Sequence, residues 1–203
     1  MEQQDSKDLI DNEEVINEDV TNEDVTNEDI STSKKKYNIR KIIFWILAIT
    51  MMVVIFVFSA KNADDSTQES HRVGKFIGYM LESDFENWTE DAQNRYAEKY
   101  DHPIRKTAHF LEYMTLAILI FGAVYDSPYD LEEQSRRKKL DARNTCIPWC
   151  FATLYAISDE FHQTLVPGRS GQPSDIYIDG SGALLGVVLA FLITKAIGKY
   201  INS

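Results

Sequence analysis

The chain has few of the residues that several common functional classes require. Its only two cysteines, Cys146 and Cys150, are four positions apart, so they form no CxxC redox motif and no second pair completes a zinc site. We interpret both as small apolar residues of a helix. No HExxH or other dedicated metal-binding spacing is present. Nucleic-acid binding has no support, because lysine and arginine form only small clusters beside apolar runs.

Acidic charge is concentrated at the N-terminus. Residues 1–33 contain twelve acids and one base, a net charge of −11, whereas the rest of the chain has 20 acids and 20 bases. A repeat of five residues (NEDVT twice, then NEDIS) covers residues 17–31 with one apolar residue per unit, too few to form a core. We predict a disordered acidic tail over 1–33, either a solvated spacer or a segment that binds a basic partner.

The remaining residues, 34–203, contain four apolar runs long enough to cross a lipid bilayer. The first run has 19 residues, and a helix of that length rises about 28 Å, close to the thickness of the hydrocarbon core. Too many residues precede it for a signal peptide, so we predict an uncleaved helix. The predicted fold class is all-α, a polytopic membrane protein with a bundle of four transmembrane helices: Ile42–Ala60, His109–Tyr125, Cys146–Leu165 and Ile176–Ile197.

The positive charges predict how these spans are oriented. Basic clusters at 34–41, 136–143 and 195–199 alternate with connections that lack them. By the positive-inside rule, both termini lie in the cytoplasm, and residues 61–105 and 166–175 face outward from the cell membrane.

The outward segment 61–105 has helical patterns of its own. The apolar residues of one stretch recur at helical spacing: Val73, Phe76, Ile77, Met80 and Leu81. This pattern predicts a helix that either lies on the outer membrane surface or packs over the outer ends of the bundle. Thr89 is the predicted N-cap of a second, short helix.

Ionisable side chains of three spans converge in the outer leaflet. The helical rise places Glu112 and Asp159 about 20 Å above the inner boundary, and His109, His162 and Asp179 about 24 Å above it. Charged groups inside a membrane segment are costly, about 2.5–3.5 kcal/mol each, and such residues are usually functional or paired. On the last span, Asp175 and Asp179 share a face with the GxxxG pair Gly182 and Gly186, which permits close approach to a neighbouring helix.

Each of these residues also has a purely structural interpretation. Lys106 can extend to the interface and Arg169 can cap a helix end. Glu112 or Asp159 can pair with Lys106 only to hold the bundle together, and His109 can be an interface histidine. The hypothesis of a functional site rests on the number of charged groups and imidazoles at one depth, which exceeds what helix pairing requires.

The chain resembles the VanZ-like family of bacterial membrane proteins over about residues 42–197. The resemblance rests on three stretches: residues 105–113 (RKTAHFLEY), residues 158–163 (SDEFHQ) with VPGR at 166–169, and Asp175 with DGSG at 179–182 and Gly186. It implies an integral membrane protein of the cell envelope that contributes to low-level resistance to teicoplanin, a lipid-bearing glycopeptide.

Two main hypotheses for function follow. In the first, the chain is an enzyme that acts on a lipid or lipid-linked envelope substrate: Lys106 and Arg169 hold an anionic head group, Asp159 or Glu160 is the general base, and His109 or His162 donates the proton. A variant of it places a divalent metal ion on the two histidines with Asp179 or Glu112. In the second, the same pocket binds a lipidated glycopeptide or a wall precursor without turnover. A transporter would require an oligomer, and the sequence does not indicate an oligomeric state.

The predicted catalytic residues are His109, Glu112, Asp159, Glu160 and His162, and the predicted binding residues are Lys106, Tyr113, Gln163, Arg169, Asp175 and Asp179.

Overall fold

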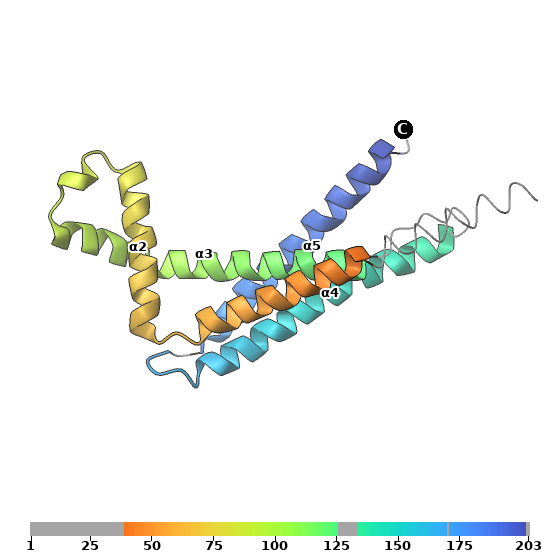
Figure 1. Cartoon of the computed structure of the whole chain (residues 1–203), viewed down its shortest axis with the longest axis horizontal. Helices are drawn as coiled ribbons and strands as arrows, with labels where there is room; N and C mark the ends of the chain where they lie inside the picture. The colour runs from red at the N-terminus through yellow and green to blue at the C-terminus, as the bar shows by residue number, and fades with distance from the viewer. Residues whose placement is uncertain (1–38, 126–133, 170, 202–203) are drawn as a thin grey trace, which may run out of the picture. The chain divides into compact units, whose positions relative to one another are not determined.

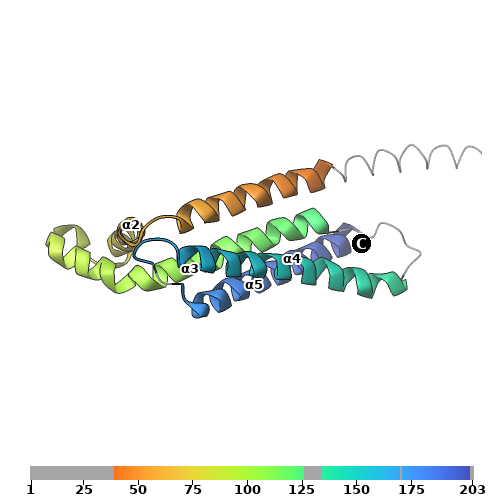
Figure 2. The same ribbon diagram turned by 90° about the horizontal axis from the view of Figure 1, so that it is seen from below.

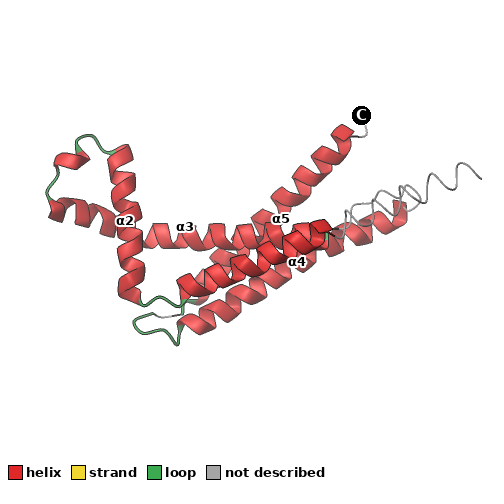
Figure 3. Cartoon of the chain, in the orientation of Figure 1, coloured by secondary structure: helices red, strands yellow, loops and turns green. Residues whose placement is uncertain are grey.

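The computed structural model describes residues 39–125, 134–169 and 171–201, and the predicted acidic tail lies outside these ranges. Helices make up almost all of the described chain, which contains no strand (Figure 3). An all-α fold was predicted and is confirmed. The elements are a first helix Ile39–Ser59, α2 Ala63–Leu81, the short 3-10 helix η1 Phe85–Asn87, α3 Glu90–Val124, α4 Gln134–Gln163 and α5 Pro173–Ile201.

The helix α3 is much longer than the predicted second span. It begins where Thr89 accepts a hydrogen bond from the backbone N–H of Ala92 at 3.4 Å, so the predicted N-cap is confirmed. The prediction of a separate short helix is wrong, because α3 continues for 35 residues through Pro103. Proline removes one backbone hydrogen bond and disfavours a helix interior. Here packing on both sides of Pro103 holds the helix together, against α2 near Ala97 and against α5 from Lys106 onward.

Three helices of the described chain are long and apolar enough to cross a membrane. They are the first helix, α3 and α5, and their apolar windows are mostly unburied within the protein. Side chains such as Ile46, Val53 and Leu192 are more than half exposed, as expected of faces covered by lipid. The predicted third span, Cys146–Leu165, lies in α4 as far as Gln163 but does not meet this criterion. Its apolar stretch ends before Ser158, Asp159 and Glu160. The predicted count of four spans is therefore not confirmed.

The closest helix packing joins α3 and α5, which run in the same direction. A β-carbon at Gly182 would collide with the backbone oxygen of Phe110, and one at Gly186 would collide with that of Met114. The two glycines thus let the backbones touch, as the GxxxG pattern predicts. This contact sets the register that brings Asp175 to Lys106 and Asp179 to His109.

The helix α4 lies alongside α3 and α5 (Figures 1 and 2). Its Trp149 indole N–H donates to the carbonyl of Gly180 at 3.1 Å, and its Tyr155 hydroxyl donates to the carbonyl of Met52 at 2.8 Å. These bonds tie α4 to both α5 and the first helix. The buried core combines alanine, aliphatic and aromatic residues of α3 with residues of the first helix, α4 and α5: Ala48, Ile55, Tyr113, Leu116, Ala117, Ile120, Phe121, Ala152, Ala156, Ala183 and Val187.

Candidate functional site

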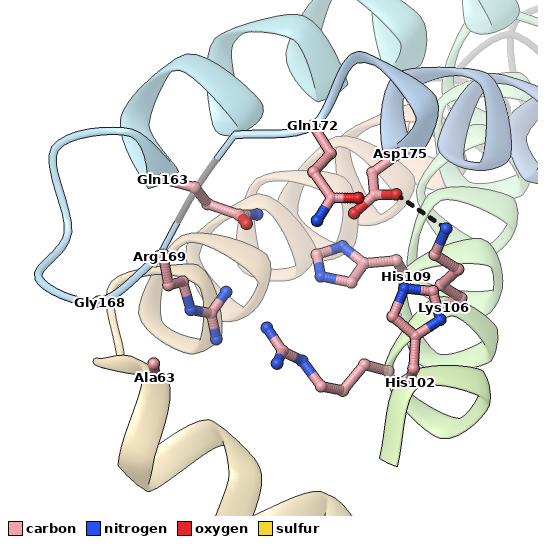
Figure 4. A pocket seen from close by; sticks show the side chains of 10 residues that line it. Ala63, His102, Lys106, His109, Gln163, Gly168, Arg169, Gln172 and Asp175 are labelled. Atoms are coloured by element: carbon pink, nitrogen blue, oxygen red, sulfur yellow. Dashed lines mark ion pairs between the residues drawn. The ribbon is translucent and has the colours of Figure 1, made fainter. Parts of the chain in front are cut away.

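A polar pocket of about 140 Å³ lies where α3, the beginning of α2 and the connection between α4 and α5 meet (Figure 4). Five predicted site residues line it, with side chains directed into one space. Five further lining residues had not been predicted. The predicted residues are Lys106, His109, Gln163, Arg169 and Asp175, and the others are Ala63, His102, Arg105, Gly168 and Gln172.

An ion pair and a histidine–carboxylate contact join α3 to α5 beside the pocket. The Lys106 ammonium lies 3.3 Å from the Asp175 carboxylate. The Nδ1 atom of His109 lies 3.9 Å from Oδ1 of Asp179, a distance for an ionic contact but too long for a hydrogen bond. Lys106 therefore pairs with Asp175. The structural interpretation of the sequence had expected Glu112 or Asp159 as its partner.

Arg169 presents hydrogen-bond donors with nothing to donate to. Its Nε and Nη1 atoms are buried and have no hydrogen-bond partner in the described part of the protein. Burial lowers the pKa of the Arg169 guanidinium, and the positive charge of Arg105 lowers it further. Asp159, Glu160 and Glu112 offset part of this charge at longer range. The pocket thus holds two neighbouring guanidinium groups, an arrangement that a bound anion would stabilise.

Contacts with Asp101 hold the Arg105 side chain in place on the side away from the pocket. Its guanidinium lies 4.0 Å from Asp101, one helical turn earlier, and Asp101 also accepts a hydrogen bond from the hydroxyl of Ser70 on α2. Arg105 is therefore held between α2 and the pocket.

A cluster of buried acids lies beside the pocket without lining it. Asp159 is 4% exposed, accepts a hydrogen bond from Gln163 at 3.1 Å, and interacts electrostatically with Glu112, Tyr113 and Asp179. Asp179 is 1% exposed, and neither of its carboxylate oxygens has a hydrogen-bond partner among the described residues. The negative charge of Asp159 offsets part of the effect of burial, which lowers the pKa of the Arg169 guanidinium overall.

Two predicted catalytic residues lie outside the pocket lining and contact other parts of the chain. The His162 imidazole stacks on the ring of Phe56 in the first helix, with centroids 4.7 Å apart, and does not line the pocket. The Glu160 carboxylate accepts a hydrogen bond from the backbone N–H of Gln172. That bond fastens the connection between α4 and α5, in which Gly168 has a positive φ of 76° and presses against Ala63.

The structure does not assemble the proposed metal ligands. No group of three His, Cys, Asp or Glu side chains suited to a metal ion occurs among the described residues. His109 and Asp179 lie together, but His162 is turned toward the first helix. Cys146 and Cys150 are free and exposed.

The pocket residues of α3 that were missed follow from its length. His102 and Arg105 precede Lys106 and His109 at helical spacing, so all four can reach one side of a continuous helix. Because the span was predicted to begin at His109, the positions before it were assigned to a loop. A test for helix continuity through Pro103 would have found them.

A comparison with protein-family models places the chain in a known family. The sequence model of the VanZ/LLP1 family matches residues 44–194, which include every residue of the pocket. No curated protein and no solved structure matches the chain. Because the family match covers most of the sequence, including α2 to α5 almost completely, the chain is a member of the VanZ/LLP1 family, with helices of membrane-spanning length and composition.

Proposed function

We propose that the pocket binds the phosphate-bearing head group of a lipid or lipid-linked envelope precursor in the outer leaflet, and that the chain acts on it by acid–base catalysis. The observation that carries this proposal is Arg169, whose buried N–H groups lack partners beside a second guanidinium, Arg105. Guanidinium groups match phosphate oxygens in a two-pronged geometry, so one phosphate would satisfy both residues.

The size of the pocket favours a small head group. Its volume is about 140 Å³, whereas sites for drug-sized ligands occupy about 300–1,000 Å³. A whole glycopeptide does not fit such a space. Any contribution to teicoplanin resistance would then arise through a changed envelope lipid or precursor and not through capture of the drug. The alternative, a binding protein without turnover, makes a different prediction in the experiment below.

In the proposed reaction, His109 exchanges a proton with the bound ligand. Its imidazole lines the pocket, and Asp179 lies 3.9 Å from its Nδ1 atom. Contacts of this kind tighten when a ligand binds, and the Asp179 carboxylate would then orient the imidazole and stabilise its charged form. Asp159, which does not line the pocket, adds negative charge near His109. It accepts a hydrogen bond from Gln163, which does line the pocket.

Asp179→Asn is expected to lower activity by about 100-fold, the lower end of what a positioned acid–base group contributes. The amide keeps the shape of the side chain but cannot balance a charged imidazole. The rate should therefore lose the His109 limb of its pH profile, while melting temperature and ligand affinity stay close to those of the wild type. An unchanged pH profile in Asp179→Asn would contradict this role.

The orientation of the chain is part of the proposal. The pocket lies at the end of the helices that also holds residues 59–63 and 163–173. Along the sequence, the basic clusters precede the first helix, lie near the beginning of α4 and lie near the end of α5. By the positive-inside rule, the pocket then faces outward and both termini are cytoplasmic.

The function is tested by mass spectrometry of envelope lipids and wall precursors. Cells would carry no copy, the wild type, or the double variant Asp159→Asn/His109→Ala at equal abundance. A phosphate-bearing species that changes with the wild type alone supports an enzyme. If no species changes but the purified wild type retains a phospholipid in native mass spectra, the chain is a binding protein. If no species changes and the purified wild type retains no phospholipid, the proposal is overturned.

A further inference from the structure

The helix α2 carries an apolar face that nothing in the described chain covers. Val73, Phe76 and Met80 are 46%, 63% and 70% exposed although all three are large and apolar. They are spaced at i, i+3 and i+7, so they form one stripe along the second half of the helix. Lys75 lies off this stripe, whereas Arg72 lies at its edge beside Phe76.

The direction of α2 is transverse to the membrane-spanning helices. It begins directly after the first helix, with Asn62 as N-cap, and it crosses α3 where Gly74 meets Ala97 at close range. Two perpendicular views show it running across the axes of α3 and of the first helix (Figures 1 and 2). A helix with this direction at the end of two spans lies parallel to a bilayer surface.

The face of α2 that turns toward the membrane is identified by Glu69. Glu69 lies on the same face as Val73, Phe76 and Met80, at i, i+4, i+7 and i+11. It forms an ion pair with Lys61, which follows the end of the first helix and covers the ring of Phe58 at 4.2 Å. Since Lys61 and Phe58 belong to the membrane-spanning end of the chain, the face that includes Glu69 is directed toward the bilayer.

We propose that α2 is an interfacial helix, with Val73, Phe76 and Met80 inserted among the lipids of the outer leaflet. Helices of this kind bury their apolar face about 5–10 Å into the boundary between head groups and acyl chains. The inserted face continues the lipid-covered surface of the first helix. This inference does not depend on what the pocket binds.

One consequence links α2 to the pocket. Its first residue, Ala63, lines the pocket and lies against Gly168, and its Ser70 donates to Asp101, which holds Arg105. With α2 in the interface, the mouth of the pocket lies at the level of lipid head groups. A lipid can then reach Arg105 and Arg169 laterally, without leaving the membrane.

The depth of α2 can be measured with single labels. In a chain whose Cys146 and Cys150 are replaced by serine, Phe76→Cys and Met80→Cys each receive an environment-sensitive fluorophore, and Lys75→Cys is the matched control. The protein is reconstituted in phosphatidylcholine–phosphatidylglycerol vesicles with nitroxide groups at shallow or deep acyl positions. We expect blue-shifted emission and strong shallow quenching at residues 76 and 80, and quenching by aqueous iodide at residue 75.

Two results would overturn the proposal. One is equal exposure of all three labels to iodide, which would place α2 in water. The other is crosslinking between two copies through residue 76 that rises with protein density, which would mean that a second chain covers the stripe. In both cases, far-ultraviolet circular dichroism that matches the wild type ensures that the labelled proteins are folded.

Discussion

Arg169→Lys is expected to weaken binding of a phosphate-bearing lipid by about 10- to 100-fold, the loss corresponding to one or two hydrogen bonds to a charged group. Lysine keeps the positive charge that Asp159, Glu160 and Glu112 offset, so the fold should be preserved. It lacks the two-pronged geometry of the guanidinium, whose Nε and Nη1 atoms are free to bind a ligand.

The matched control for this change is Arg95→Lys, at an exposed position of α3 outside the pocket. Affinity would be measured by native mass spectrometry with lipid phosphates, and inorganic phosphate would compete as the free anion. A free phosphate that binds as tightly as the lipid would show that the acyl chain adds nothing. Affinity of Arg169→Lys equal to that of Arg95→Lys would mean that the pocket does not use the Arg169 guanidinium.

Gly182→Ala is expected to destabilise the protein by about 1–3 kcal/mol or more, the range for overpacking a tight contact. The added carbon would collide with the backbone oxygen of Phe110, and a backbone cannot turn aside as a flexible side chain can. Because α3 and α5 would separate, the pairs Lys106–Asp175 and His109–Asp179 should loosen together, and ligand binding should decline with stability.

Gly180→Ala is the control, two residues away on the same helix. A β-carbon there would lie 3.6 Å from Thr153, an ordinary van der Waals contact. Alanine also favours a helix over glycine by about 1 kcal/mol. Thermal unfolding in detergent should therefore rank Gly180→Ala at or above the wild type and Gly182→Ala well below it. Equal melting temperatures for the two variants would exclude the close contact between α3 and α5.

The face of α5 could be predicted because its residues obey simple spacing. Asp175, Asp179, Gly182 and Gly186 all meet α3, as the helical period indicates. The beginning of α3 could not be predicted as well, since Pro103 and the polar residues around it resemble a boundary. Only contacts with α2 and α5, which are distant in sequence, keep the helix continuous there.

The direction in which side chains point was the second feature that could not be predicted from the sequence. Glu112, Asp159 and Asp179 were expected to share one site with Lys106 and Arg169, but these three acids do not line the pocket that holds the two cations. His162 is on the expected helix at the expected depth, yet it stacks on Phe56. Helical period assigns a residue to a side of its own helix, whereas the neighbour it meets depends on how the helices are rotated against one another.

The register between α3 and α5 also sets an order of events during synthesis. Lys106 and His109 find their acidic partners about seventy residues later in the chain, at Asp175 and Asp179. While α3 enters the bilayer, both groups lack these partners, at a stage when charged groups are costly to insert. The contacts of Lys106 and His109 with α5 therefore form only after the last helix is in place, and a chain that stops before Pro173 would lack the Asp175 side of the pocket.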